Sequence, residues 1–400
     1  MEDLLFLVHR IPYPPNKGDK IRSFHILEYL SRAYRIHLGT FIDQPSDRRY
    51  CAKVSQYCTS TWFGTLSPRR AKARSLVGFL TGEALTLPYY RQPGLTQWIR
   101  TLRKHNRIRR VLVYSSAMAQ YVLGHDFDDT RRVIDFVDVD SDKWRQYSAA
   151  KRFPMDLIYR REAARLSDFE RRVADIFDAS VFVSEQEAAL FRQNPSQGAS
   201  YVFGINNGVD ADYFAPDPHR PTPFRGDGQR IVFTGAMDYW ANEDGADWFA
   251  RQILPALRQR FPACEFFIVG MNPTDRVRQL ERLPGVTVTG SVPDVRPYLQ
   301  HASAVAVPLR IARGIQNKVL EAMAMGRPVV TTPQALEGIN ARAGREIHVA
   351  EDAGDFVEQV ARLLAEGGET MGADARRFVV SHFSWESSLP KLLELLEDET

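Results

Sequence analysis

The sequence predicts an α/β protein of two domains, each built on a parallel sheet wrapped by helices. The chain has 400 residues, more than a single hydrophobic core usually accommodates. In both halves, short continuous apolar runs alternate with segments of helical periodicity, as buried parallel strands and their crossover helices require. Residues 204–228 are rich in Gly, Asn, Asp and Pro, a composition typical of a linker between domains.

The apolar runs predict the strands. The first half contains runs at residues 4–8, 36–41, 111–114, 133–137 and 179–183, and the second half at 230–235, 266–270, 286–290, 304–307 and 328–330. We expect a long polar helical stretch between residues 143 and 178, and a last helix, over residues 385–397, that packs back across the junction. Ligands of such sheets bind beyond the carboxyl ends of the strands, so the loops there are where functional residues are expected.

Composition excludes several classes of protein. The 52 basic and 49 acidic side chains nearly balance, which gives no argument for nucleic acid. Three cysteines cannot form a disulfide framework and match no zinc motif, which fits a reducing compartment. No metal and no cofactor are expected. The chain runs directly into an apolar strand and lacks a stretch of the ~20 apolar residues that a membrane span needs. We therefore expect a cytoplasmic protein without a secretory leader.

The first half is locally basic, with aromatic and aliphatic residues interleaved. This pattern suits a surface that meets anionic lipid headgroups at the inner face of the membrane, or a phosphorylated acceptor. A solvated helix face along which arginine stems lie is the simpler interpretation, and we prefer it. The basic residues are Arg69, Arg70, Lys72, Arg74, Arg100, Arg103, Lys104, Arg107, Arg109 and Arg110.

Residues 314–330 are the most specific segment for chemistry. They are predicted to form a loop, a helix and the next buried strand. Gly314 at the helix start would let backbone N–H groups approach a phosphate, and Lys318 would add a positive charge to a diphosphate. Glu321 can accept hydrogen bonds from ribose hydroxyls. The segment therefore indicates a nucleoside diphosphate site, with a capped surface helix as the simpler alternative.

With these motifs in place, the chain resembles the retaining GT-B glycosyltransferases of glycosyltransferase family four, and more closely the sugar transferases of bacterial exopolysaccharide and exosortase (PEP-CTERM) systems. The resemblance covers nearly the whole chain. It implies two Rossmann-like domains that face each other across a cleft: an acceptor domain, 1–205 with the C-terminal helix 380–400, and a donor domain, 206–379. The matching segments are residues 12–22, 135–141, 183–185, 207–210, 234–239 and 314–330.

The resemblance also assigns residues, with two departures. Glu321 matches the second Glu of the paired-glutamate motif, whereas Arg313 stands where the first Glu is expected. Arg313 and Arg310 could instead bind the diphosphate or a carboxylated sugar. Val137 stands where many members carry an active-site His, so Asp138 and Asp140 are the candidates for its polar contacts. A cap for the following helix is the alternative role of these two aspartates.

Two further segments are assigned to donor binding by the resemblance. The loop at residues 14–22 is similar to the flexible loop that closes over the donor; in it Gly18 and Asp19 would allow close backbone approach, and Lys17, Lys20 and Arg22 would supply charge. A surface turn punctuated by prolines is the alternative interpretation. Gly235 belongs to the matching segment 234–239.

The predicted activity is transfer of a sugar from a UDP- or GDP-sugar to a glycan or lipid-linked acceptor, with retention of configuration implied by the resemblance. Lys318 and a helix N-terminus would neutralise the leaving diphosphate without a metal. Two alternatives stay open. One is a nucleotide-sugar 2-epimerase of the same fold, and the other is a catalytically inactive nucleotide-sugar binder that acts as a scaffold.

Overall fold

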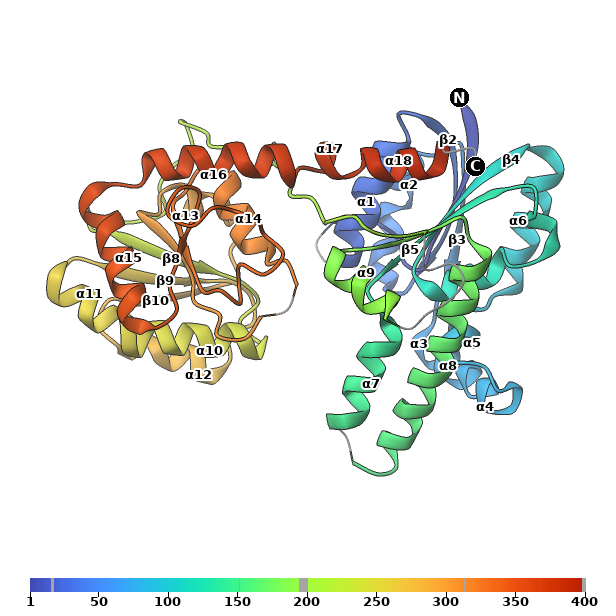
Figure 1. Ribbon diagram of the computed structural model, residues 1–400, viewed down its shortest axis with the longest axis horizontal. Coiled ribbons are helices and arrows are strands. Elements are labelled where there is room, and N and C mark those ends of the chain that lie inside the picture. Colours follow the sequence, from blue (N-terminus) through green and yellow to red (C-terminus); the bar gives the residue numbers. More distant parts are fainter. Residues whose placement is uncertain (16–17, 151, 194–200, 313, 398–400) are drawn as a thin grey trace. The chain divides into compact units, whose positions relative to one another are not determined.

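The computed structural model describes residues 1–15, 18–150, 152–193, 201–312 and 314–397 (Figure 1). The chain divides into two compact units. The first unit is Met1–Asn206 together with Ser388–Thr400, and the second is Asn207–Ser387. Each unit has its own hydrophobic core, as expected of segments of this size.

The first unit contains a seven-stranded parallel sheet in the order β3-β2-β1-β4-β5-β6-β7. Side chains of β1 from Leu4 to Val8 are fully buried, as a central strand covered on both faces requires. The strands are β1 (Glu2–Val8), β2 (Tyr34–Ile42), β3 (Ser60–Thr65), β4 (Ile108–Tyr114), β5 (Arg131–Val137), β6 (Ala179–Phe182) and β7 (Val202–Gly204).

Helices cover this sheet, with α1 and α6 on opposite faces (Figure 1). The C-terminal helix α18 belongs to the same unit, because Arg110 and Arg131 at the starts of β4 and β5 donate hydrogen bonds to its last carbonyls. The helices are α1 (Gly18–Leu30), α2 (Cys51–Ser55), α3 (Pro68–Ser75), α4 (Val77–Thr81), α5 (Thr86–Tyr90), α6 (Pro93–His105), α7 (Asp140–Ala150), α8 (Met155–Ile176), α9 (Glu185–Arg192) and α18 (Pro390–Glu397).

The second unit contains a six-stranded parallel sheet in the order β10-β9-β8-β11-β12-β13. Its core joins β8 and β11 to the apolar side of the helices, including Leu320 and Met323. The strands are β8 (Arg230–Thr234), β9 (Glu265–Val269), β10 (Val286–Gly290), β11 (Ala304–Val307), β12 (Val329–Thr331) and β13 (His348–Val349).

Helices α10 and α14 lie on opposite faces of this second sheet (Figure 1). Helix α17 crosses the boundary between the units at Ser387 and Ser388. The helices are α10 (Trp240–Trp248), α11 (Leu254–Arg260), α12 (Asp275–Arg278), α13 (Arg296–Gln300), α14 (Asn317–Ala324), α15 (Ala353–Glu366), α16 (Glu369–His382) and α17 (Trp385–Ser388).

The predicted α/β class with two parallel sheets is confirmed, and each of the ten predicted strands is present. The edge strands β3, β7 and β13 were not predicted, because each is short or partly polar. Two helix predictions were wrong. The stretch 143–178 is two helices, α7 and α8, and the predicted last helix is divided into α17 and α18. Pro154 and Pro390 stand at these breaks, where proline disfavours a helical residue before it.

Both sheets reverse their strand order at one point. In the first unit the reversal lies between β1 and β4, and in the second between β8 and β11. At such a point the neighbouring crossovers leave toward opposite faces, which opens a crevice beyond the carboxyl ends of the strands. In the second unit, a ligand site is therefore expected beyond the carboxyl ends of β8 and β11.

A buried ion pair joins α1 to the first sheet. Arg22 Nε donates to Asp135 Oδ2 over 2.7 Å, and Arg22 Nη1 donates to the carbonyl oxygen of Ile205 over 2.9 Å. Both charged side chains are almost fully inaccessible. Lys20 is likewise buried, with its Nζ 2.6 Å from Asp47 Oδ2. The expectation that Lys20 and Arg22 supply charge to the diphosphate or the acceptor is therefore wrong, because burial in ion pairs occupies both. Lys17, the third residue of that expectation, lies outside the described residues.

We expect Arg22→Met to destabilise the first unit by about 3 kcal/mol, because the Asp135 carboxylate would stay buried without its partner. Denaturant unfolding followed by circular dichroism measures the change. Arg171→Met is the matched control, since it breaks the exposed Arg171–Asp168 pair of the same unit, where about 0–1 kcal/mol is expected. Equal losses in both variants would contradict the proposed importance of the buried pair.

Candidate functional site

A cavity of about 400 Å³ lies at the reversal point of the second sheet. Loops after the four strands β8, β9, β10 and β11 and the first turn of α14 form its wall, so it occupies the position that the strand order predicts. Lys318 and Glu321 lie at this cavity together with Gly235. The lining residues are Thr234, Gly235, Ala236, Val269, Gly270, Met271, Ser291, Val292, Val295, Ile315, Asn317, Lys318 and Glu321.

Two glycines allow the backbones after β8 and β9 to meet on one side of the cavity. A Cβ atom on Gly270 would lie 1.6 Å from the carbonyl oxygen of Gly235, which no rearrangement of a side chain can relieve. A Cβ atom on Gly235 would lie 2.8 Å from the Asn242 amide nitrogen and 3.3 Å from Lys318 Nζ. Glycine at these positions thus brings the main chain next to the lysine ammonium.

The Lys318 ammonium is fixed by a residue that sequence reasoning missed. Lys318 Nζ donates to Asn242 Oδ1 over 2.5 Å, and Asn242 Nδ2 donates to the carbonyl oxygen of Ala236 over 2.8 Å. Nζ also lies 5.1 Å from the centre of the Phe233 ring, within range of a cation–π contact. Asn242 is almost fully buried at the start of α10, and no local sequence signal reveals it, because its contacts form only in the folded sheet.

Glu321 lies one turn after Lys318 on the same face of α14. No hydrogen bond from the described residues reaches its carboxylate. Burial raises the pKa of Glu321 to about 7, and the Lys318 charge offsets part of that rise. Burial lowers the pKa of Lys318 to about 8, with Glu321 acting in the opposite direction. The pair therefore changes charge close to neutral pH, which is common at functional sites.

The other predicted donor residues of this unit lie differently. Helix α14 begins at Asn317 and not at Gly314. Gly314 is in a turn with a φ of 65°, a conformation that favours glycine. Arg310 forms an ion pair with Asp244, through Nε at 3.0 Å, and is not among the residues that line the cavity. Arg313 falls outside the described residues.

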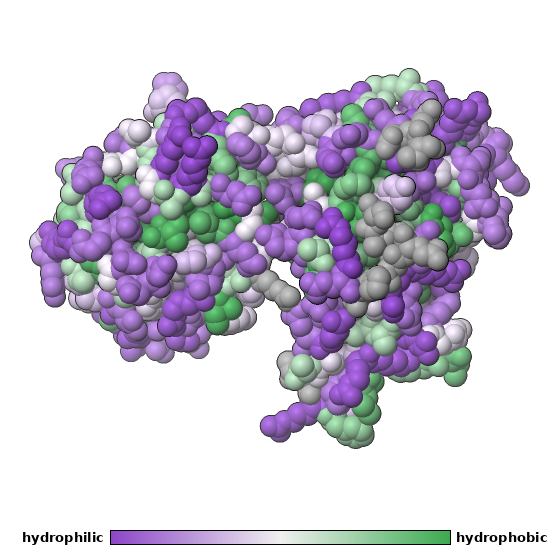
Figure 2. Space-filling view, viewed as in Figure 1, coloured by the Kyte–Doolittle hydropathy of each residue, from purple (hydrophilic) through white to green (hydrophobic). Residues whose placement is uncertain are grey.

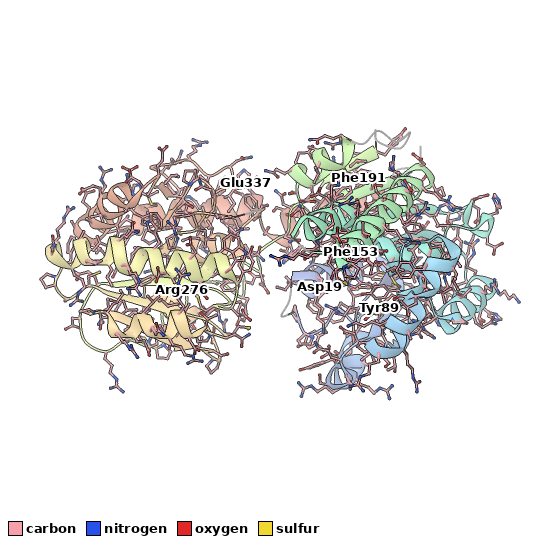
Figure 3. The ribbon with its side chains drawn as sticks, turned by 90° about the horizontal axis from the view of Figure 1, so that it is seen from below. Asp19, Tyr89, Phe153, Phe191, Arg276 and Glu337 are labelled. Carbon is pink, nitrogen blue, oxygen red and sulfur yellow. The ribbon has the colours of Figure 1, made fainter. Side chains whose placement is uncertain are left out.

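In the first unit, Gly18 and Asp19 form the start of α1 (Figure 3). Gly18 is exposed. Asp19 Oδ2 accepts a hydrogen bond from Arg10 Nη1 over 2.8 Å and lies 3.5 Å from His9 Nε2. Burial raises the pKa of Asp19, but His9 and Arg10 lower it more, so this carboxylate stays ionised. In the structure the Asp19 carboxylate thus contacts His9 and Arg10, the two residues that follow β1.

Asp138 and Asp140 follow β5 and share one lysine. Lys143 Nζ lies 2.6 Å from Asp138 Oδ2 and 3.5 Å from Asp140 Oδ1. Burial raises the pKa of Asp140, partly offset by Lys143. The nearby Glu170 carboxyl, which accepts a 2.6 Å hydrogen bond from Ser141 Oγ, has its pKa raised to about 8 by burial and by the Asp140 charge. The structure thus gathers three carboxyl groups and one ammonium beyond β5.

The backbone ahead of these aspartates is strained. Val137 has a φ of 75°, which is rare and unfavourable for a β-branched residue. Its N–H donates to Asp135 Oδ1 over 3.0 Å, so the carboxylate that pairs with Arg22 also supports this turn. Backbone strain of this kind is common at active sites and ligand-binding sites.

Neither a metal-binding cluster nor a membrane-spanning helix is found among the described residues. They contain no group of three or more His, Cys, Asp and Glu side chains placed to hold a metal ion. Within the same residues, every helix is too short or too polar to cross a bilayer.

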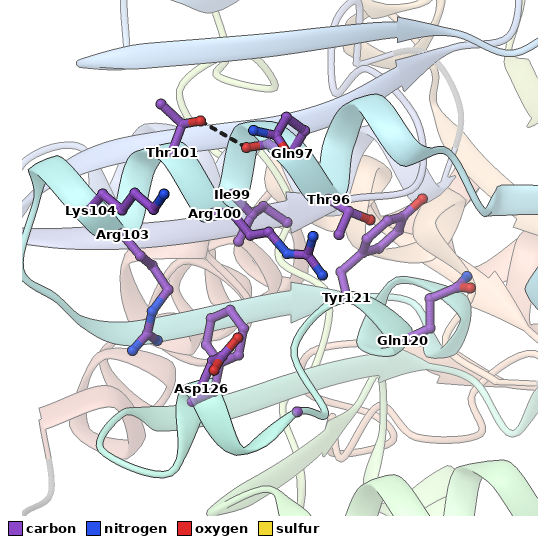
Figure 4. A pocket seen from close by; sticks show the side chains of 12 residues that line it. Thr96, Gln97, Ile99, Arg100, Thr101, Arg103, Lys104, Gln120, Tyr121 and Asp126 are labelled. Atoms are coloured by element: carbon purple, nitrogen blue, oxygen red, sulfur yellow. Dashed lines mark hydrogen bonds between the residues drawn. The ribbon is translucent and has the colours of Figure 1, made fainter.

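A larger cavity, of about 700 Å³, lies between α6 and residues 120–127 of the first unit (Figure 4). It contains none of the residues predicted for the site. Arg100, Arg103 and Lys104 contribute to its wall, but Arg103 is paired with Asp129 over 3.0 Å and lies over the Phe127 ring. This cavity is therefore a basic groove, and Arg103 in its wall already has partners.

Residues 228–366, within the second unit, match the family model described as "Glycosyl transferases group 1". The match covers the strands β8–β13 and helix α14, and therefore the whole wall of the 400 Å³ cavity. Comparison with curated protein sequences found no match.

Solved structures share the fold over nearly the full chain. Sucrose-phosphate synthase from Thermosynechococcus elongatus is 17% identical, covers 99% of this chain and 98% of its own, and has a TM-score of 0.67. HepE from Anabaena in complex with UDP is 14% identical, with 99% of each chain covered and a TM-score of 0.67. WaaG, a glycosyltransferase involved in lipopolysaccharide biosynthesis, is 16% identical, covers 99% of this chain and 100% of its own, and has a TM-score of 0.62. The chain has the GT-B fold, and the domain match together with this fold supports a glycosyltransferase.

We expect Glu321→Gln to stabilise the protein at about pH 8 by ~1 kcal/mol and to have less effect at about pH 5. A glutamate whose folded pKa lies above the unfolded value adds stability below the unfolded pKa and loses it as pH rises through the folded pKa. The neutral glutamine avoids that loss. Denaturant unfolding of both proteins at the two pH values measures it, and a gain that does not depend on pH would contradict the assigned pKa.

Proposed function

We propose that this protein transfers a sugar from a nucleoside diphosphate sugar, and that the cavity at the reversal point of the second sheet binds the nucleotide. The convergence of Lys318 and Glu321 on this cavity carries the proposal. A cation held beside the glycine backbone suits a diphosphate. One helical turn away, a carboxylate to which none of the described residues donates a hydrogen bond suits ribose hydroxyls. Structures of HepE contain UDP and UDP-glucose, which supports a nucleotide sugar as the donor here.

Finer parts of the proposal concern the reaction. Lys318, with Arg313 and Gly314 of the preceding loop, is proposed to stabilise the leaving diphosphate, so that the reaction needs no metal. Asp138 and Asp140 are proposed as the catalytic carboxylates of the first unit, and Gly18, Asp19, Gly235 and Arg310 as supports of donor binding. Retention of configuration, membership of glycosyltransferase family four and a link to the exosortase-associated transferases rest on the motif resemblance.

The biological setting is also a proposal. A glycan or a lipid-linked sugar is the proposed acceptor, in exopolysaccharide biosynthesis at the inner face of the cytoplasmic membrane. A peripheral contact with that membrane would bring a lipid-linked acceptor to the enzyme. WaaG, which shares the fold, is described as acting in lipopolysaccharide biosynthesis, and this agrees with a role in the assembly of surface glycans.

A panel of UDP- and GDP-sugars, screened by thermal shift, identifies the donor, because a ligand that binds only the folded state raises its apparent stability. Release of nucleoside diphosphate that depends on an added acceptor is the result expected of the transferase. Interconversion of the sugar would instead indicate an epimerase, and binding without turnover would indicate a scaffold. Either outcome would overturn the proposed activity while leaving the nucleotide site in place.

Variants of the cavity test the two key side chains separately. Glu321→Ala is expected to weaken nucleotide affinity about tenfold, the loss of one or two hydrogen bonds to a charged group. Lys318→Ala is expected to slow turnover at least tenfold by removing charge from the leaving diphosphate. Calorimetry and initial rates measure the two effects. Glu358→Ala is the control, because Glu358 is exposed on α15 and pairs with Arg260; unchanged affinity and turnover in both cavity variants would exclude this site.

The pKa of Lys318 also predicts how nucleotide affinity depends on pH. Lys318 is charged below about pH 8 and neutral above it, so affinity for the nucleoside diphosphate is expected to decline as pH rises through about 8. Arginine stays protonated throughout this range. Lys318→Arg should therefore lose most of the alkaline decline, as titration calorimetry at several pH values can measure. The same decline in both proteins would assign it to another group.

A further inference from the structure

Exposed apolar side chains concentrate in two segments of the first unit, residues 76–80 and 147–157. Among the described residues, half of the large hydrophobic side chains that are exposed lie in these two segments. Leu80 is 89% exposed and Phe153 is 79% exposed, so these side chains stand out from the surface. We call the set the apolar tip; its members are Leu76, Val77, Phe79, Leu80, Tyr147, Phe153, Met155 and Leu157.

The two segments are held side by side, although about 70 residues separate them in the chain. Arg161 Nη2, on α8, donates to the carbonyl oxygens of Gly78 and Glu83 over 2.6 and 3.1 Å. Its guanidinium lies 4.9 Å from the centre of the Phe79 ring. Leu157 is one turn before Arg161 on the same face of the helix. Arg161 therefore joins the two segments of the apolar tip at Phe79.

A second set of contacts makes this arrangement rigid. The Glu162 carboxylate accepts hydrogen bonds from Leu85 N over 2.6 Å and from Thr86 N and Oγ1 over 2.9 and 2.7 Å. Glu162 is almost fully buried. Figure 2 shows apolar residues at the free end of the α7–α8 hairpin and over α4. Glu162 thus fixes α8 against residues 85 and 86, next to the exposed apolar side chains of residues 76–80.

The charge around the apolar tip is positive. Residues 67–82 contain four basic residues and no acidic one, and Arg69, Arg70 and Lys72 are exposed. On the hairpin, exposed Arg152 and Arg160 flank the apolar residues. An apolar centre with a cationic border matches the interface of an anionic bilayer, where acyl chains accept the apolar groups and headgroups accept the charges.

We propose that the apolar tip inserts into the headgroup region of an anionic lipid bilayer and attaches the first unit to it. Side chains that project as far as Leu80 and Phe153 suit a fluid lipid layer, which can close around them, better than the flat, charge-depleted centre of a protein interface. This surface is separate from the basic groove beside α6. The inference rests on the peripheral membrane contact of the proposed function and names the surface that would make it.

Co-sedimentation of the full chain with vesicles tests the inference. Vesicles of phosphatidylcholine mixed with phosphatidylglycerol are compared with vesicles of phosphatidylcholine alone. We expect binding to the anionic vesicles that weakens with salt. The double variant Leu80→Gln, Phe153→Gln should lower the partition coefficient at least about tenfold, because two apolar anchors are lost. Val380→Gln is the control, since Val380 is an exposed apolar residue of α16 in the second unit.

A charge variant separates insertion from simple attraction. Replacing Arg69, Arg70 and Lys72 by Gln should weaken binding and reduce its dependence on salt. Absence of binding to anionic vesicles, or binding that the double apolar variant leaves unchanged, would overturn the proposal. So would self-association in solution that the double apolar variant abolishes, because a second copy would then cover the surface. Nucleotide affinity measured on each variant reports on the donor site alone, so failure of one proposal is distinguishable from failure of the other.

Discussion

The hydrogen bond between Lys318 and Asn242 is the interaction on which the proposed donor cavity depends. Lys318 follows β11 and Asn242 follows β8, so the bond spans the point at which the strand order reverses. Asn242 also holds the carbonyl oxygen of Ala236, in the loop where two glycine backbones meet. A lysine side chain is long and flexible, and without this amide its charge would have no fixed position. The crevice that the topology provides becomes a specific site through a single buried asparagine.

This cavity differs in kind from the buried ion pair of the first unit. Arg22 and Asp135 face each other directly, and the Arg22 guanidinium has a second acceptor in the Ile205 carbonyl. Such a closed pair fixes α1 on its sheet. Lys318 and Glu321 share a helix face, and burial shifts both pKa values toward neutral pH. A bound diphosphate would add an anion beside Lys318, and ribose hydroxyls would donate to the Glu321 carboxylate. A ligand would thereby offset the electrostatic cost of burying the two groups.

Much of the fold was predictable because buried parallel strands are continuous apolar runs, which a single sequence shows directly. Lys318 and Glu321 were predictable for a similar local reason: they lie one turn apart on one helix, just after a buried strand. Asn242 was not, because its importance comes from contacts with Ala236 and Lys318 that only the folded sheet brings together. The same holds for Arg310, whose charge is met by Asp244, 66 residues away in the chain.

The apolar tip illustrates the same limit at the surface. From the sequence, residues 69–80 suit either a membrane surface or a solvated helix face, and nothing local decides between them. The proposal of a membrane surface rests on the second segment, 147–157, which the expectation of one long polar helix concealed. Once Pro154 separates α7 from α8, the hairpin end carries Phe153 outward, and Arg161 holds that hairpin against Phe79. In the sequence each of the two segments is compatible with an ordinary exposed helix. In the folded protein Arg161 and the buried Glu162 join α8 to residues 78–86, so that both segments belong to one part of the first unit.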